Sequence, residues 1–164
     1  MTLTLDEKIG IVLALVISKK IAPEFTLFSH DSSEISLSDY KGKWVILFFY
    51  SKDGSPVCKR GCLSFKEQYE VFKSVNCEVI GISNDSIQTH KEFKELLDLP
   101  FPLLSDNDNL VRNLYDVPNY LGKFPGKSSF LINPDGEIVH VYDWLFRPRK
   151  HVAKILSILN EING

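Results

Sequence analysis

Tyr50-Ser-Lys-Asp-Gly-Ser-Pro-Val-Cys-Lys-Arg-Gly-Cys-Leu-Ser-Phe65 is the stretch around which the sequence is organised. The apolar run 44–50 ends where it begins, and it is continuous, β-branched and aromatic, which predicts a strand buried on both faces. A polar turn follows, and apolar residues then recur at helical spacing from Cys58 to Phe72. The order strand, turn and helix places Cys58 in the first turn of a helix.

A thiol at this position is suited to chemistry. Free backbone N–H groups and the helix dipole favour an anion there, so they favour the thiolate, which is the reactive form. Lys59 and Arg60 add positive charge nearby. A single cysteine is more often a buried structural residue, but the polar turn and a second thiol at Cys62 favour a reactive site.

Composition limits the functional classes. A chain of 164 residues is long enough for one domain with a substantial core. The formal net charge is −2, and there is no basic excess that would indicate a nucleic-acid partner. Three cysteines at no framework spacing argue for a reducing compartment. Cys77 begins an apolar run and is interpreted as structural.

The N-terminal apolar run, residues 9–17, is far shorter than the roughly 20 residues of a membrane-spanning helix. Asp6 and Glu7 precede the run, where a signal peptide would carry basic residues. We therefore expect residues 1–20 to be an extension that docks on or flanks one domain over 21–164. A weak membrane or partner contact through this run is the alternative.

The rest of the sequence alternates between strand and helix patterns. Helices are expected over 56–75, 86–97, 109–115 and 147–163, and strands over 44–50, 77–83, 103–104, 128–133 and 137–142. Segment 118–126, rich in Gly and Pro, is expected as a loop, and Asn133-Pro-Asp-Gly136 is typical of a hairpin turn. This order predicts an α/β fold with a mixed central β-sheet flanked by helices on both faces.

From about residue 21 to the C-terminus, the chain resembles peroxiredoxins of the peroxiredoxin Q or bacterioferritin-comigratory-protein type (AhpC/TSA-like). The motifs that carry the resemblance are Ala22-Pro-Glu-Phe-Thr-Leu27, Leu37-Ser-Asp-Tyr-Lys-Gly42, Tyr50-Ser-Lys-Asp-Gly-Ser-Pro-Val-Cys58, Phe101-Pro-Leu-Leu-Ser-Asp106 and Ser129-Phe-Leu-Ile-Asn-Pro-Asp-Gly136. The resemblance implies a thioredoxin-like fold and thiol-dependent reduction of hydrogen peroxide and organic hydroperoxides.

The resemblance also implies roles for four site residues. Cys58 falls at the peroxidatic position, and Ser55 supplies the hydroxyl three residues before it, where the family usually has Thr. Ser51 stands where the family has a proline that shields the thiolate, and Lys127 where it has an active-site arginine. Lysine is a flexible point charge and lacks the planar fork of donors of arginine, so the charge is kept while the geometry is weakened.

Cys62 is a candidate resolving cysteine, with a buried core thiol as the alternative. In this subfamily a resolving cysteine in the same helix usually lies five residues after the peroxidatic one, where this chain has Leu63. Helical side chains four residues apart have Cβ atoms about 5–6 Å apart, whereas a disulfide needs roughly 3.5–4.5 Å. A Cys58–Cys62 disulfide therefore requires the first turn of the helix to unwind.

The function that follows is a thiol peroxidase acting through a cysteine sulfenic acid and recycled by thioredoxin or a similar dithiol. It needs no metal or organic cofactor, and we expect a monomer or dimer in the cytoplasm, or in the plastid stroma of a photosynthetic eukaryote. A Sco-like copper chaperone would also place Cys-x-x-x-Cys after the first core strand, but it uses a histidine that segment 120–129 lacks. A non-catalytic thiol sensor is the third possibility, based on Ser51 and Lys127.

Overall fold

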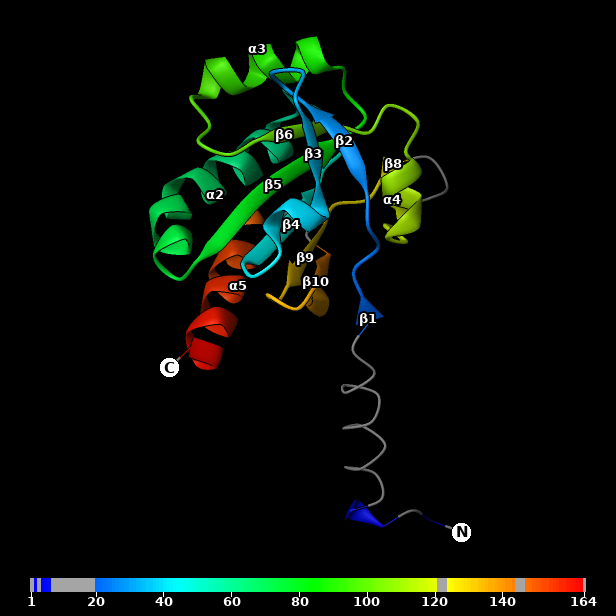
Figure 1. Cartoon of the computed structure of the whole chain (residues 1–164), viewed down its shortest axis with the longest axis vertical. Helices are drawn as coiled ribbons and strands as arrows, with labels where there is room; N and C mark the ends of the chain where they lie inside the picture. The colour runs from blue at the N-terminus through cyan, green and yellow to red at the C-terminus, as the bar shows by residue number, and fades with distance from the viewer. Residues whose placement is uncertain (1, 3, 7–19, 121–123, 144–146, 164) are drawn as a thin grey trace.

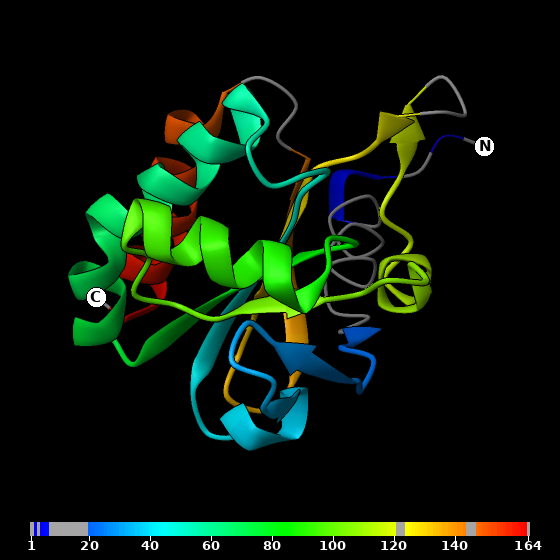
Figure 2. The ribbon, with the colours of Figure 1, turned by 90° about the horizontal axis from the view of Figure 1, so that it is seen from above.

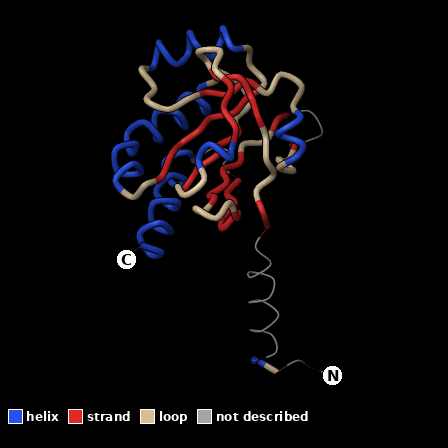
Figure 3. Tube along the Cα trace, in the orientation of Figure 1, coloured by secondary structure: helices blue, strands red, loops and turns tan. Residues whose placement is uncertain are grey.

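The computed structural model describes residues 2, 4–6, 20–120, 124–143 and 147–163. The predicted docking of the apolar run 9–17 lies outside these residues. Within them, no helix has both the length and the apolar character needed to cross a membrane. The expected α/β architecture is confirmed, with a central sheet between helices (Figures 1 and 3).

The sheet has eight strands in the order β1-β10-β9-β4-β5-β6-β2-β3. They are β1 (Lys20–Ile21), β2 (Thr26–Ser29), β3 (Glu34–Ser36), β4 (Trp44–Phe49), β5 (Cys77–Ser83), β6 (Leu103–Ser105), β9 (Ser128–Ile132) and β10 (Glu137–Asp143). Strands β4, β5 and β6 are parallel to one another, and the other pairs are antiparallel, so the predicted mixed sheet is confirmed. All six residues of β4 are buried, as its continuous apolar run predicts.

Helices cover both faces of the sheet. They are η1 (Leu37–Tyr40), a 3₁₀ helix, and the α-helices α2 (Pro56–Ser74), α3 (Ile87–Leu97), α4 (Leu110–Leu114) and α5 (Pro148–Asn163). α2 and α5 pack side by side on one face, and α4 lies on the opposite side (Figures 1 and 2). The even-numbered residues of β4 enter the core beneath α2 and α5, and its odd-numbered residues enter the core beneath η1 and α4.

Local signals set most element boundaries correctly. The side chain of Ser86 accepts a hydrogen bond from the Thr89 backbone N–H, so it caps α3 as expected. Asp106 accepts hydrogen bonds from the backbone N–H groups of Val111 and Arg112 and so fixes the start of α4. Gly136 has φ of 84° in the predicted hairpin turn between β9 and β10, a conformation that favours glycine.

One expectation needs correction. The predicted loop 118–126 contains a short antiparallel pair, β7 (Asn119–Tyr120) and β8 (Phe124–Pro125). Strands of two residues carry too little sequence pattern to be predicted. This correction does not affect the region around Cys58.

Candidate active site

The first turn of α2 holds Cys58 beneath the preceding turn. Pro56 occupies the first helical position, where its missing N–H is not needed and its fixed φ favours the helix. Ser55 is the residue before the helix, and its side chain makes no capping hydrogen bond. The Cys58 side chain is 0% exposed and lies in the core between α2 and the sheet.

Ser51 provides the hydroxyl that contacts the thiol. Its Oγ lies 3.3 Å from Cys58 Sγ, which is hydrogen-bond distance for sulfur. When Cys58 is a thiolate, the Ser51 hydroxyl is the donor. Ser51, which stands where the family has a proline, therefore brings a polar group into contact with the sulfur. Among the described residues, the hydrogen-bond partner of the sulfur is Ser51 rather than Ser55 or Lys127.

The backbone of Lys127 lies near the turn that carries Cys58, but its side chain makes no hydrogen bond to the thiol. Phe49 pairs with Ser128 across β4 and β9, so Lys127 lies next to the Tyr50 end of β4, from which the Cys58 turn departs. Its side chain is half-buried. The structure thus places Lys127 at the edge of the site, as the sequence suggests, while its role stays a prediction.

Arg112 on α4 is a buried cation that the sequence analysis missed. Its side chain is 5% exposed, and its guanidinium donates to two backbone carbonyls: Nη1 to Gly126 O and Nη2 to Tyr50 O, both at 2.8 Å. Burial lowers the pKa of Arg112, while the charges of Asp106 and of Cys58 act in the opposite direction. The only sequence signal was an arginine on the apolar side of a short helix.

A buried polar cluster holds the turn from the other side. The Tyr50 hydroxyl donates to Asp53 Oδ1 at 2.6 Å, and Asp53 Oδ2 lies 2.7 Å from His90 Nδ1. His90 Nε2 lies 3.1 Å from the carbonyl of Leu104. Both ring nitrogens of His90 therefore face oxygen atoms, and the ring links the turn to β6. The Asp53 N–H also donates to Asp85 at 2.8 Å, which ties the turn to the loop after β5.

Asp53, Asp85 and His90 are also a group, among the described residues, whose ligand atoms come within 4.8 Å of one another. The 2.7 Å separation between Asp53 and His90 is a hydrogen-bond distance, and both nitrogens of the histidine are already engaged. The arrangement fits a hydrogen-bonded pair that positions the turn better than it fits a metal centre.

Cys62 lies one turn below Cys58 in the same core, and it is also 0% exposed. Burial raises the pKa of Cys62, and the charges of Asp53 and Cys58 raise it further. Cys62 is therefore a protonated thiol at neutral pH and a poor nucleophile in the folded helix. Gly61 lies between the two cysteines, and glycine destabilises a helix interior by about 1 kcal/mol relative to alanine.

Cys77, at the start of β5, is 1% exposed and lies in the core, as expected for a structural cysteine.

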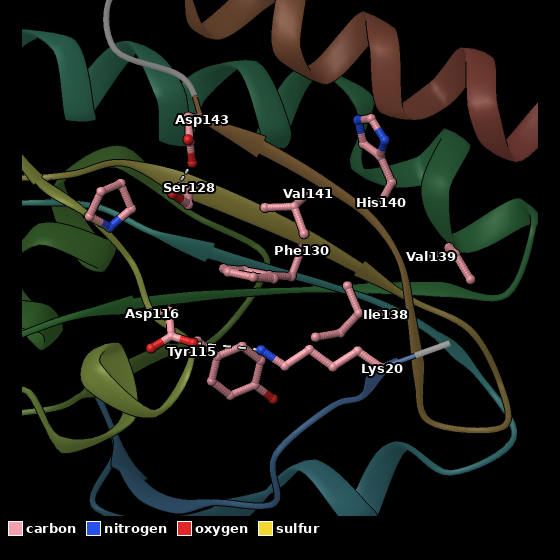
Figure 4. A pocket seen from close by; sticks show the side chains of 11 residues that line it. Lys20, Tyr115, Asp116, Ser128, Phe130, Ile138, Val139, His140, Val141 and Asp143 are labelled. Atoms are coloured by element: carbon pink, nitrogen blue, oxygen red, sulfur yellow. Dashed lines mark hydrogen bonds and ion pairs between the residues drawn. The ribbon is translucent and has the colours of Figure 1, made fainter. Parts of the chain in front are cut away.

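A separate cavity of about 680 Å³ lies near Tyr115 and Phe130 on the opposite face of the sheet. Figure 4 shows its lining, with Ser128 bonded to Asp143 at one end and Lys20 paired with Asp116 at the other. No cysteine lines this cavity, so it is not the thiol site.

Comparison with known proteins gives consistent matches. A family model described as the AhpC/TSA family matches residues 19–141. The chloroplastic peroxiredoxin Q of Oryza sativa subsp. japonica is 40% identical over 153 residues, which are 93% of this chain and 70% of the rice protein. The chloroplastic peroxiredoxin Q of Triticum aestivum is 39% identical over 154 residues, covering 93% and 71% of the two chains.

Solved structures agree with these matches. Peroxidoxin BcpB from Mycobacterium tuberculosis has a TM-score of 0.82 at 27% identity and covers 89% of this chain and 97% of that one. The bacterioferritin comigratory protein of Xanthomonas campestris, solved in a study of its alkyl peroxide reduction activity, has a TM-score of 0.79 at 26% identity. That likeness covers 85% of this chain and 92% of the bacterial one.

Proposed function

Since the chain belongs to the AhpC/TSA family of peroxiredoxins and is a thiol-dependent peroxidase, we propose that Cys58 is the residue that attacks the peroxide. The observation that carries this assignment is the contact between Ser51 Oγ and Cys58 Sγ at the first turn of α2. A hydroxyl donor and free backbone N–H groups both favour the thiolate there. The copper-chaperone alternative is not favoured by these relatives.

The first step is a two-electron oxidation of sulfur. The Cys58 thiolate attacks one peroxide oxygen, and an S–O bond forms as the O–O bond breaks. The departing oxygen takes a proton and leaves as water or an alcohol. We assign Ser51 to hold the thiolate, and Ser55 and Lys127 to hold the peroxide and stabilise the charge that develops on the departing oxygen.

Cys62 is proposed to resolve the sulfenic acid. Its thiol condenses with Cys58–SOH, a disulfide forms, and water leaves. The helical spacing holds the two Cβ atoms too far apart, so the first turn of α2 must unwind before the bond forms. Gly61 lowers the cost of that unwinding, and exposure to water removes the burial that keeps Cys62 protonated.

An external dithiol reduces the enzyme, and we propose thioredoxin or a protein like it for this role. The thiol reductant itself follows from the family, whereas its identity, like a monomeric or dimeric state, is part of the proposal. The names of the plant relatives place them in chloroplasts. We propose the plastid stroma for this chain in a photosynthetic eukaryote and the cytoplasm in any other source.

A coupled assay with thioredoxin, thioredoxin reductase and NADPH tests these roles. We expect Cys58→Ser to abolish consumption of hydrogen peroxide and Cys62→Ser to lose most of the turnover. Cys77→Ala, which removes the remaining thiol, should keep the wild-type rate. Unchanged turnover in Cys58→Ser would refute the assignment of Cys58, and unchanged turnover in Cys62→Ser would refute only the resolving role.

A further inference from the structure

We propose that Arg112 is the positioning residue of this peroxidase, a buried guanidinium that holds the two halves of the active site together and supplies a fixed positive charge to the Cys58 thiolate. The inference rests on the proposed role of Cys58 and goes beyond it. A buried thiolate needs such a charge, because burial disfavours the charged form of a thiol. Lys127, the cation expected from the sequence, makes no hydrogen bond to the sulfur, whose partner is Ser51.

The contacts of Arg112 lead directly to the thiol. Its Nη2 donates to the carbonyl of Tyr50 at 2.8 Å, and that carbonyl belongs to the peptide bond joining Tyr50 to Ser51. The hydroxyl of Ser51 lies 3.3 Å from Cys58 Sγ. A single peptide unit thus separates the guanidinium from the residue that touches the sulfur, and its orientation depends on this hydrogen bond.

The other contact fixes the segment that carries Lys127. Arg112 Nη1 donates to the carbonyl of Gly126 at 2.8 Å. The Gly126 N–H donates to Pro118 O at 2.7 Å, and a Cβ at Gly126 would lie 2.1 Å from that oxygen, so only glycine fits. Arg112 therefore ties the end of β4 to the residue before Lys127 with the rigid fork that lysine lacks.

The surroundings of Arg112 leave its charge available to the thiolate. Asp106 is the nearby acid, but its two carboxylate oxygens accept the backbone N–H groups of Val111 and Arg112. The side-chain donors described above meet neutral carbonyls. The charge on Cys58 is one of the causes that favour the protonated form of Arg112, so the guanidinium lies within electrostatic reach of the sulfur.

Other ionisable groups surround the thiol. Asp53 in the turn is paired with His90 on α3, and Cys62 on α2 is a neutral thiol. Lys59 and Arg60, on the helix of Cys58, are exposed, so water screens their charges. Lys127, the residue before β9, is half-buried. Arg112 is the cation in this set with a fixed geometry in a water-poor environment.

The experiment compares Arg112→Met and Arg112→Lys with Arg149→Met, a matched loss of one positive charge at an arginine whose side chain is 83% exposed. The measurements are the second-order rate of Cys58 oxidation by hydrogen peroxide, the pH profile of Cys58 alkylation by iodoacetamide, and the melting temperature. We expect Arg112→Met to slow oxidation about tenfold and to move the alkylation midpoint up by about one pH unit. Arg149→Met should change neither.

Arg112→Lys separates charge from geometry. Lysine keeps the positive charge but lacks the planar fork of donors. We therefore expect an alkylation midpoint near that of the wild-type protein and an oxidation rate between those of the wild type and Arg112→Met. Equal midpoints and rates in Arg112→Met and Arg149→Met would overturn the proposal. If Arg112→Met does not fold, a wild-type rate in Arg112→Lys would overturn it, and a reduced rate would support it. If instead the wild-type protein is not oxidised at Cys58, the proposed function fails.

Discussion

At the scale of single residues, Lys127 stands where the family has an active-site arginine. In the proposed mechanism, a lysine next to the Tyr50 end of β4 supplies positive charge to the departing oxygen but lacks the rigid planar fork of donors that arginine has. We expect Lys127→Arg to raise the rate of Cys58 oxidation by hydrogen peroxide and Lys127→Ala to lower it several-fold. Loss of one well-placed donor costs about 10²–10³ in rate at other anion-stabilising sites, and a mobile lysine contributes only part of that.

Stopped-flow oxidation of the three proteins at pH 7 checks this prediction. Arg149→Met serves again as the control for net charge, because that arginine is exposed and lies in α5. Identical rates in the three Lys127 proteins would show that Lys127 does not face the reacting oxygen. Arg112 would then be the cation that matters for the reaction.

Ser51 shows the limit of residue-by-residue comparison. The sequence shows that Ser51 stands where the family has a proline. From the sequence alone, this substitution indicated only the loss of a residue that shields the thiolate. The structure shows that the substituted residue supplies a hydroxyl 3.3 Å from the sulfur. A contact between residues seven apart depends on the path of the turn, which sequence spacing does not determine.

At the scale of elements, α5 docks on the sheet through His151. The ring stacks on Tyr142 at 5.3 Å between centroids and meets Phe65 of α2 edge-on at 5.2 Å, and Nε2 lies 2.5 Å from Ser129 Oγ. Burial lowers the pKa of His151 to about 3, helped by the charge of His140 and opposed by a hydrogen bond to the Pro148 carbonyl. His151 is therefore neutral in the fold at every pH above that value.

This depressed pKa predicts an acid-sensitive fold. Above pH 6.5 His151 is neutral in both states and adds no pH dependence. Between pH 6.5 and about 3, His151 binds a proton in the unfolded chain but not in the folded chain. The free energy of unfolding therefore decreases by up to about 1.4 kcal/mol for each unit by which the pH is lowered. We expect His151→Gln to remove most of this slope, measured by urea unfolding at pH 7.5, 6.5 and 5.5.

His140→Gln is the matched control for this experiment. Burial also lowers the pKa of His140, but its side chain on β10 is only partly buried, so its removal should change the slope less. Equal stability of the wild-type protein at pH 7.5 and 5.5 would contradict the prediction. So would a slope in His151→Gln equal to that of the wild type.

The sequence predicted these elements well because the relevant signals are local. The all-apolar run gave β4, the helical stripe from Cys58 to Phe72 gave the buried face of α2, and Asn133-Pro-Asp-Gly136 gave the hairpin turn. The short β7–β8 ladder was missed because two-residue strands have no periodicity to read.

At the scale of the whole molecule, the candidate active site lies at the carboxyl edge of the parallel strands. β4 ends before Tyr50, β5 ends at Ser83, and β6 ends at Ser105. The loops that follow these strands carry the Cys58 turn, Asp85 and Asp106 to the same edge. Open α/β sheets place their ligands at this edge, and the thioredoxin-like fold expected from the sequence is confirmed by the solved relatives.

The residues that the sequence could not identify are those that reach this edge from a distance. Arg112 contacts a carbonyl 62 positions earlier in the chain, and His90 meets a carboxylate 37 positions earlier. Neither pair has a local pattern, because the contact exists only once the sheet has brought the loops together. Cys58 could be proposed from the sequence because a thiol in the first turn of a helix is a local pattern.

The most direct test of the whole account is to find which sulfur peroxide oxidises first. The Cys62→Ser protein, which cannot form the Cys58–Cys62 disulfide, should be treated with one equivalent of hydrogen peroxide in the presence of dimedone and analysed by peptide mass spectrometry. We predict a single adduct at Cys58 and an unmodified Cys77, because Cys58 alone combines a helix N-terminus with the Ser51 hydroxyl. A first adduct at Cys77, or none at Cys58, would contradict the account.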